Sequence, residues 1–407
     1  MKKAYAVLAS ALLAPAVALA FETVDTLPWP SDGRFPAYPR ESTRPTDLWF
    51  HAGLMRDDNL LRLDAGEEAD TVTRLGGGFR HVQRVIGRQN LRVEARADYY
   101  RFDQFDHLNH LAWAGLADWR WEIGNELSGS IALGRERRLI DLSETSALGV
   151  RSMVTATRLS ATGGYLVTPR LRLRAGLAGA TAERTGVEDE ETRATSITGG
   201  VDYVSPLGNT LGVEARGTQG DGRFEEIVGT VDNDYREREI ALVGSYAIGP
   251  RLRAEGRLGR TTRRYGDIAD RDFEGTTWRL GAEWLPGNKT RLALELYKEP
   301  RSVIDISSAH VVLEGVSFGP SWAVTSKLVV SARLLSEQRT FEGDPLIAVA
   351  GAPLRDERTR VLRFGVGWEP LRHWQAGFAV DRGQREANFA GRDYQFTAAT
   401  ANLAWRY

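Results

Sequence analysis

The chain has 407 residues, of which 42% are hydrophobic and 26% charged, and its net charge at pH 7 is −1. That balance gives no bulk electrostatic basis for binding nucleic acid. The absence of cysteine excludes disulfides, thiol chemistry and cysteine-based metal sites. Only five of the 53 basic residues are Lys, and the 42 Gly and 11 Trp suit many tight turns and an aromatic-rich surface better than a helical bundle.

Residues 1–20 have the pattern of an export signal. Lys2 and Lys3 precede an apolar stretch, and Ala18–Ala20 (Ala-Leu-Ala) has the small-x-small form of a cleavage site. The apolar stretch is shorter than the ~20 residues that a membrane helix needs, so the sequence predicts a cleaved signal peptide. Residues 21–46 are rich in Pro and lack periodicity. They are predicted to form an extended periplasmic lead-in or a segment inside a lumen.

From residue 47 onward, short turn signals such as Gly124-Asn125 and Gly249-Pro250 recur about every 40 residues. Propeller blades have a similar period, but each blade needs four short strands. Here each repeat contains two long alternating runs, one short turn and one longer polar stretch. The pattern therefore predicts an all-β fold for residues 47–407, a transmembrane antiparallel up-and-down β-barrel with short periplasmic turns and longer extracellular loops.

Eight turns and nine loops predict 18 strands. An even number is what a single-chain bacterial barrel requires, and both ends of the barrel segment then lie on the periplasmic side. The weakest strand patterns are Arg151–Val167 and Val311–Val324, the second because Pro320 disfavours a strand centre. Sixteen strands is therefore the alternative count.

The alternating runs carry apolar residues on one face and charges on the other. In one of them, Leu171 and Leu173 alternate with Arg170, Arg172 and Arg174. The charges that these registers make candidate lumen-lining residues are Arg92, Arg96, Arg172, Arg174, Arg253, Arg257, Arg279, Arg291, Glu94, Glu255, Glu283 and Glu295. Across all registers, twelve Arg and eleven acids face the interior. An Arg ladder guiding an anionic glycan is one interpretation, but the near-equal numbers favour Arg–acid pairing along the wall.

The final stretch, Asp393–Tyr407, alternates to its last residue, with Leu403, Trp405 and Tyr407 standing two apart. It resembles the C-terminal strand of bacterial outer-membrane barrels, which ends in an aromatic residue. That resemblance implies an insertion signal met by the barrel assembly machinery. We expect this strand to run antiparallel to the first strand, Asp47–Arg56, and to supply its missing hydrogen-bond partners.

A further motif follows the first strand. Residues 57–63 read Asp-Asp-Asn-Leu-Leu-Arg-Leu, and residues 70–78 read Asp-Thr-Val-Thr-Arg-Leu-Gly-Gly-Gly. This arrangement resembles a family of β-barrel porins, in particular the EpsL-type proteins encoded in exopolysaccharide biosynthesis operons. In chemical terms, Asp57, Asp58 and Asn59 are turn formers, and Arg62 is placed to pair with either Asp. A Ca²⁺ site, which needs six to eight oxygens, is the less favoured alternative.

The resemblance implies an outer-membrane protein that takes part in exopolysaccharide biosynthesis or export as a porin-like conduit. A substrate-specific or general diffusion porin, and a structural barrel with a filled lumen, are the alternatives. The expected partners are outer-membrane lipid, the barrel assembly machinery, and the exopolysaccharide with its periplasmic export components. The six His lie in neither a Gly-x-Ser-x-Gly nor a His-Glu-x-x-His context. The sequence therefore predicts no catalytic residues, no cofactor and no metal.

Overall fold

The computed structural model describes residues 45–140, 142–145, 150–185, 190–226, 229–232, 234–266, 272–305, 308–342 and 354–407. The predicted signal peptide and almost all of the predicted lead-in lie outside these residues. Nineteen described strands form one antiparallel sheet. They are β1 (Thr46–Asp57), β2 (Asp70–Arg84), β3 (Asn90–Phe102), β4 (His110–Ile123), β5 (Leu127–Leu139), β6 (Met153–Thr168), β7 (Leu171–Thr185), β8 (Glu190–Val204), β9 (Thr210–Glu226), β10 (Gly229–Asp232), β11 (Tyr235–Ile248), β12 (Leu252–Tyr265), β13 (Phe273–Trp284), β14 (Thr290–Asp305), β15 (Ser308–Ala323), β16 (Leu328–Glu342), β17 (Asp356–Leu371), β18 (Trp374–Ala387) and β19 (Tyr394–Arg406).

Two short helical segments lie in the connections, η2 (Asp106–Leu108) and α1 (Leu142–Thr145). Among the described residues, no helix has the length and apolar character needed to cross a membrane.

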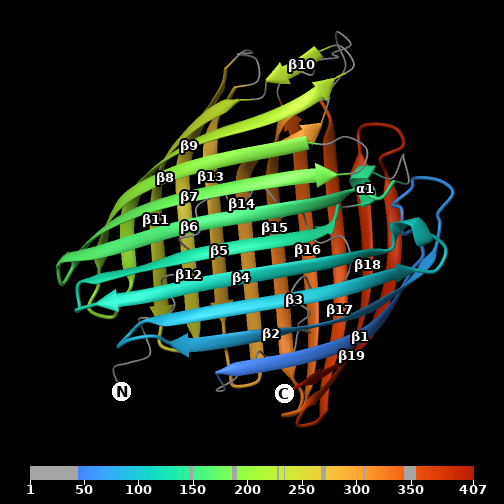
Figure 1. Cartoon of the computed structure of the whole chain (residues 1–407), viewed down its shortest axis with the longest axis horizontal. Coiled ribbons are helices and arrows are strands. Elements are labelled where there is room, and N and C mark those ends of the chain that lie inside the picture. Colours follow the sequence, from blue (N-terminus) through green and yellow to red (C-terminus); the bar gives the residue numbers. More distant parts are fainter. Residues whose placement is uncertain are drawn as a thin grey trace.

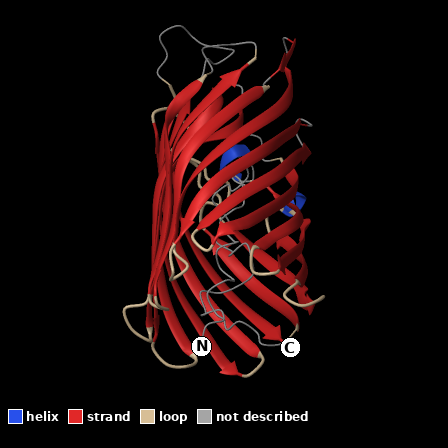
Figure 2. Ribbon diagram, turned by 90° about the vertical axis from the view of Figure 1, so that its left-hand side faces the viewer, coloured by secondary structure: helices blue, strands red, loops and turns tan. Residues whose placement is uncertain are grey.

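The sheet closes on itself as an 18-stranded up-and-down barrel, as predicted (Figures 1 and 2). Sequential strands pair as hairpins, except that β10 only extends the end of β9, which also pairs with β11. β1 pairs antiparallel with β19 from Trp49–Arg406 to Asp57–Ala398. Closure matters physically because an open sheet edge cannot satisfy its backbone groups in lipid.

The sixteen-strand alternative is wrong because both weak segments are full strands, β6 and β15. Pro320 pairs with Leu292 of β14, while the ladder between β15 and β16 is interrupted between Phe318–Leu334 and Ser321–Ser331 and resumes in the same register. The barrel thus accommodates the missing N–H of the proline by a short interruption of one ladder.

Eight connections of two to five residues lie at one end of the barrel, here called the turn end, and the other connections lie at the opposite end, the loop end (Figure 1). Most of the loop-end connections are longer, but only residues 306–307 join β14 to β15. Four of the short turns contain a glycine with positive φ, at Gly87, Gly124, Gly208 and Gly249. Glycine adopts this conformation at little cost, whereas a side chain would be strained. The local turn chemistry therefore produces the hairpins that the recurrent signals predicted.

The wall has an apolar outer face and a polar inner face, the reverse of a soluble protein. On β7, Leu173 and Leu177 are 45% and 58% exposed, whereas Arg174 between them is only 8% exposed. The same inversion holds on β9, where Val213 is exposed and Glu214 is buried. Such a surface is stable only where its outer side meets an apolar medium, so the alternation defines a membrane-spanning wall.

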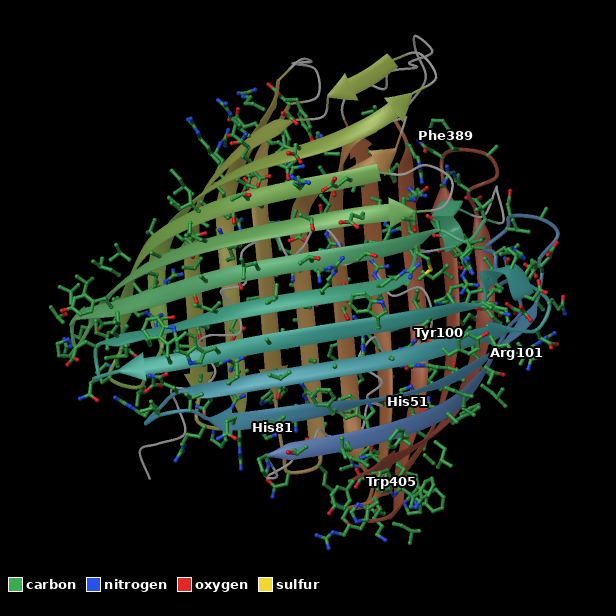
Figure 3. All side chains as sticks on the ribbon, in the orientation of Figure 1. His51, His81, Tyr100, Arg101, Phe389 and Trp405 are labelled. Atoms are coloured by element: carbon green, nitrogen blue, oxygen red, sulfur yellow. The ribbon has the colours of Figure 1, made fainter. Side chains whose placement is uncertain are left out.

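Trp and Tyr side chains gather on the outer face near the turn end. The exposed members are Trp119, Tyr165, Tyr203, Tyr246, Trp284, Trp322, Trp368, Trp374 and Tyr407. Trp405 stacks on Tyr407 with ring centroids 6.1 Å apart, and Figure 3 shows Trp405 at the lower end of the barrel. Tyr407 exchanges backbone hydrogen bonds with Leu48 near the start of β1, so both described chain ends lie at this end. Amphipathic rings favour the boundary between lipid and water, so this aromatic girdle marks one membrane interface.

An apolar cluster occupies the inner face of β1–β6 at the loop end. It contains Met55, Leu60, Leu61, Val72, Tyr100, Phe102, Leu108, Leu139, Leu142 and Met153. Leu60, Leu61, Leu108 and Leu142 come from the connections between the strands, so these connections fold inward against the wall. This inner-mouth cluster covers one side of the lumen where the outer loops begin.

Candidate functional site: the charged inner wall

The densest charge network of the wall joins β7, β8, β9, β11 and β12. The Asp202 carboxylate accepts hydrogen bonds from Arg172 and Arg174 at 2.7 and 2.6 Å. Arg174 also reaches Glu214 at 2.7 Å, and the other Glu214 oxygen accepts from Arg257 at 2.6 Å. The guanidinium and carboxylate groups therefore form a chain that crosses four strand boundaries.

Glu239 extends this chain. It accepts from Arg257 at 2.6 Å and from Arg216, and Thr277 donates to it at 3.3 Å. Because charge-assisted hydrogen bonds are short and strong, the network holds neighbouring strands in register while keeping the lumen side polar. Its guanidinium groups are occupied by protein carboxylates, which corresponds to pairing along the wall and not to a free Arg ladder.

Other predicted charges form smaller pairs on the same face. Arg291 lies 2.7 Å from Glu283, and Arg92 lies 2.5 Å from Glu94. Arg279 is 3.3 Å from Glu295. Within the described part of the chain, Arg96 and Arg253 form no ion pair, and Glu255 is half-buried without one. These residues add accessible charge of both signs to the inner wall.

Several buried pairs were missed by the sequence analysis. Glu237 accepts from Arg263 at 2.7 Å, and the Tyr297 hydroxyl donates to Glu337 at 2.5 Å. Asp98 is a further buried acid, with two partners on other strands. These are His51 at 2.6 Å and Arg74 at 2.9 Å. The signal was available for Arg263, since it continues the period-two register of Arg253 and Arg257 along β12. Partners on distant strands cannot be read from that period.

The motif after β1 forms a buried ion pair inside its own loop. Arg62 donates to both Asp57 oxygens at 2.9 and 2.8 Å. Asp57 is fully buried and Arg62 is 4% exposed. The guanidinium carbon also lies 3.7 Å from the centre of the Phe396 ring of β19. The ion pair and the ring contact together immobilise the loop.

Asn59 and Asp58 join this loop directly to β19. The Asn59 amide donates to the Leu63 and Gln395 carbonyls, both at 2.8 Å. The Asp58 carboxylate accepts from the Thr397 amide at 2.6 Å. The motif is therefore a latch between the first loop and the last strand. The described residues contain no group of three or more His, Asp and Glu that could hold a metal ion.

The histidines give no catalytic arrangement in the described residues. His51 contacts Asp98 through Nε2, as the acid–base pair of a hydrolase would. Its Nδ1 atom has no hydrogen-bond partner, so no hydroxyl nucleophile completes the set. The absence of enzymatic activity stays a prediction.

Closure, an even strand number, an apolar outer face and a charged inner face define a membrane β-barrel of the outer-membrane type. No protein-family model matches the sequence, and no curated protein matches it. The motif's resemblance to EpsL-type proteins accordingly gains no support from these comparisons.

Solved structures similar to this chain include outer-membrane proteins of Pseudomonas aeruginosa. OccK1 (OpdK) is 13% identical with a TM-score of 0.47, covering 89% of this chain and 98% of that one. OccK2 (OpdF), solved in complex with glucuronate, is 13% identical with a TM-score of 0.47, covering 89% and 97%. The siderophore receptor PirA is 7% identical with a TM-score of 0.46, covering 90% and 80%. The likeness extends to the barrel fold alone.

Proposed function

We propose that the protein is a porin-like conduit of the outer membrane that passes small polar solutes. The observation that carries this proposal is the closed 18-stranded wall with a charged inner face. Barrels of 16–18 strands are wide enough to enclose an aqueous channel. Charges are expensive in contact with lipid, so their concentration on the inner face supports a water-filled lumen.

Because the charges of the inner wall are largely paired, they support a conduit with only a weak preference between anionic and cationic solutes. In the network of β7–β12, four Arg face three acids: Arg172, Arg174, Arg216 and Arg257 against Asp202, Glu214 and Glu239. The inner-mouth cluster covers one side of the loop end and reduces the passage there. Together these features favour small hydrophilic solutes over an unselective wide pore.

The test is insertion of the purified, folded protein into planar bilayers and liposomes. We expect stepwise conductance increments, and liposome swelling rates that fall with the size of the sugar offered. Folded protein, recognised by heat-modifiable migration on gels, that gives neither increments nor swelling would identify a structural barrel with a filled lumen.

Export of an exopolysaccharide is the second candidate, favoured by the residue 57–63 motif and its resemblance to EpsL-type proteins. In the structure the motif residues serve as a latch between loop and wall, so their visible role is architectural. A strain lacking the protein should then secrete less polymer. Unchanged secretion together with conductance would leave the diffusion conduit as the function.

A further inference from the structure

Four arginines gather on the outer face of the wall at the loop end. Arg236 and Arg238 lie on β11, and Arg260 and Arg264 lie on β12. Arg236 and Arg264 are directly opposite each other in the ladder, an arrangement of like charges that destabilises a sheet. An anion bound beside these two arginines would reduce the repulsion between their guanidinium groups.

Two of the four guanidinium groups are available to a ligand. Arg264 lies 2.7 Å from Asp272, and Arg260 lies 2.6 Å from Glu274. Arg236 and Arg238 are exposed and form no ion pair or hydrogen bond with the described residues. The outer Arg patch, meaning these four residues, therefore keeps two uncompensated positive charges.

The apolar belt begins directly below this patch. Ile240 is 67% exposed, Leu242 49% and Leu258 53%. The outward apolar positions of β11 continue to Ile248, about 26 Å along the strand at ~3.3 Å per residue. A molecule that touches both surfaces must carry a negative group at one end and hydrocarbon at the other.

A break in the adjacent wall opens a cleft beside the patch. The ladder between β13 and β14 ends at Trp278–Lys298. β13 continues to Phe273 paired with β12, and β14 continues through Pro300 paired with β15. Pro300 would face β13 and has no N–H to donate. The two strand edges therefore diverge towards the loop end.

The cleft has a volume of about 750 Å³, and its lining residues come from β13, β14, β15, β16 and the residue before β13. Its outward-facing lining includes Thr276, Trp278, Lys298, Glu314, Gln338 and Thr340. Hydroxyl, amide and carboxylate groups beside an aromatic ring suit the hydroxyls and flat faces of sugars. Phe273 also lines the cleft, and its ring lies 5.6 Å from the buried ring of His310.

We propose that the outer wall of β11–β16 binds a phosphorylated glycolipid of the surrounding leaflet. Its phosphates contact Arg236 and Arg238, its sugar lies in the cleft, and its acyl chains lie along Ile240, Leu242 and Leu258. Three neighbouring surfaces thus match the three chemical parts of one molecule. The site faces lipid and does not depend on passage through the lumen.

Native mass spectrometry of the full, detergent-solubilised protein tests the site. The probes are an acylated disaccharide with two phosphates, its dephosphorylated form, phosphatidylglycerol and inorganic phosphate. We expect the phosphorylated disaccharide to bind best, and R236Q/R238Q to weaken it by roughly tenfold or more, because two charge-assisted contacts are lost. Binding should also weaken with increasing salt.

Two further variants separate the parts of the site. R135Q/R137Q removes two exposed outward arginines of β5, a strand that does not line the cleft, and should leave binding unchanged. Q338A/T340A should weaken the glycolipid but not phosphatidylglycerol. Equal binding by wild type and R236Q/R238Q would overturn the proposal, as would inorganic phosphate that competes as well as the glycolipid. Conductance of the same samples reports separately on the proposed conduit.

Discussion

Arg62 combines an unfavourable backbone with favourable side-chain contacts. Its φ of 58° is a conformation that residues with a side chain adopt at a cost of roughly 1–2 kcal/mol. The bidentate pair with Asp57 and the contact with the Phe396 ring offset that cost. The sequence indicated turn-forming acids and an Arg that could pair with them. It could not indicate Gln395 and Thr397 as partners, because these lie more than 330 residues away along the chain.

We expect Arg62→Ala to lower the free energy of unfolding by roughly 3–5 kcal/mol, because Asp57 would stay buried without its counter-charge. Arg56→Ala is the matched control, since Arg56 lies at the same end of β1 but is exposed on the outer face; its effect should stay within about 0.5 kcal/mol. Urea unfolding followed by the gel shift of the folded barrel measures both. Equal midpoints for R62A and R56A would contradict the stabilising role of the latch.

At the scale of elements, β19 closes the barrel and anchors its turn end. Leu48 of β1 exchanges backbone hydrogen bonds with Tyr407 at 3.4 and 2.9 Å. The outer face of β19 is small until Leu403, and Phe50 of β1 packs on Trp405 with ring centroids 6.1 Å apart. The period-two pattern predicted this antiparallel seam correctly. One face of the strand meets lipid and the other meets the lumen, and this difference fixes which residues point outward and therefore the register.

Deleting Trp405–Tyr407 should abolish insertion, because the start of β1 would lose its ladder partner and the girdle its last rings. The readout is the loss of heat-modifiable migration after expression. Trp374→Ala is the control, since it removes a girdle residue of the neighbouring strand without shortening any ladder. A truncated protein that still migrates as a folded barrel would count against the insertion role.

The break between β13 and β14 could not be predicted from the alternation of the two strands. Both strands alternate clearly, so their sequence suggests a complete ladder. Pro300 was the available signal, because a proline inside a wall strand withdraws one donor. The size and lining of the resulting cleft depend on β15 and β16 as well, and no local pattern contains that information.

At the scale of the whole molecule, ion pairs on the inner face of the barrel link neighbouring strands. Apolar packing on the inner face is confined to clusters such as the inner-mouth cluster. Where the inner face is polar, ion pairs and hydrogen bonds link the strands. The near balance of Arg and acids in the sequence was enough to favour pairing over a free Arg ladder. Which Arg pairs with which acid follows from the stagger of neighbouring strands.

The ion pairs on the inner wall set the net charge that a permeating ion meets, so changing one partner should change the channel's preference between anions and cations. Glu214→Gln should free part of the Arg174 and Arg257 charge and shift the channel towards anions. Reversal potentials across a salt gradient in planar bilayers measure the shift. Glu274→Gln, an acid on the outer face, should leave the reversal potential unchanged. An unchanged value for E214Q in a conducting channel would show that this network lies outside the ion path.

The sequence by itself determined the two-faced strands, the turn glycines and the seam between first and last strand, because each depends on period-two alternation or on local turn chemistry. It left the strand number at 18 or 16, and the structure decided for 18. Only the tertiary structure decided the partners of the buried charges, the latch from Asp57–Arg62 to β19, and the cleft beside β13. Those features join residues tens to hundreds of positions apart, and closure of the barrel with its particular strand stagger is what brings them together.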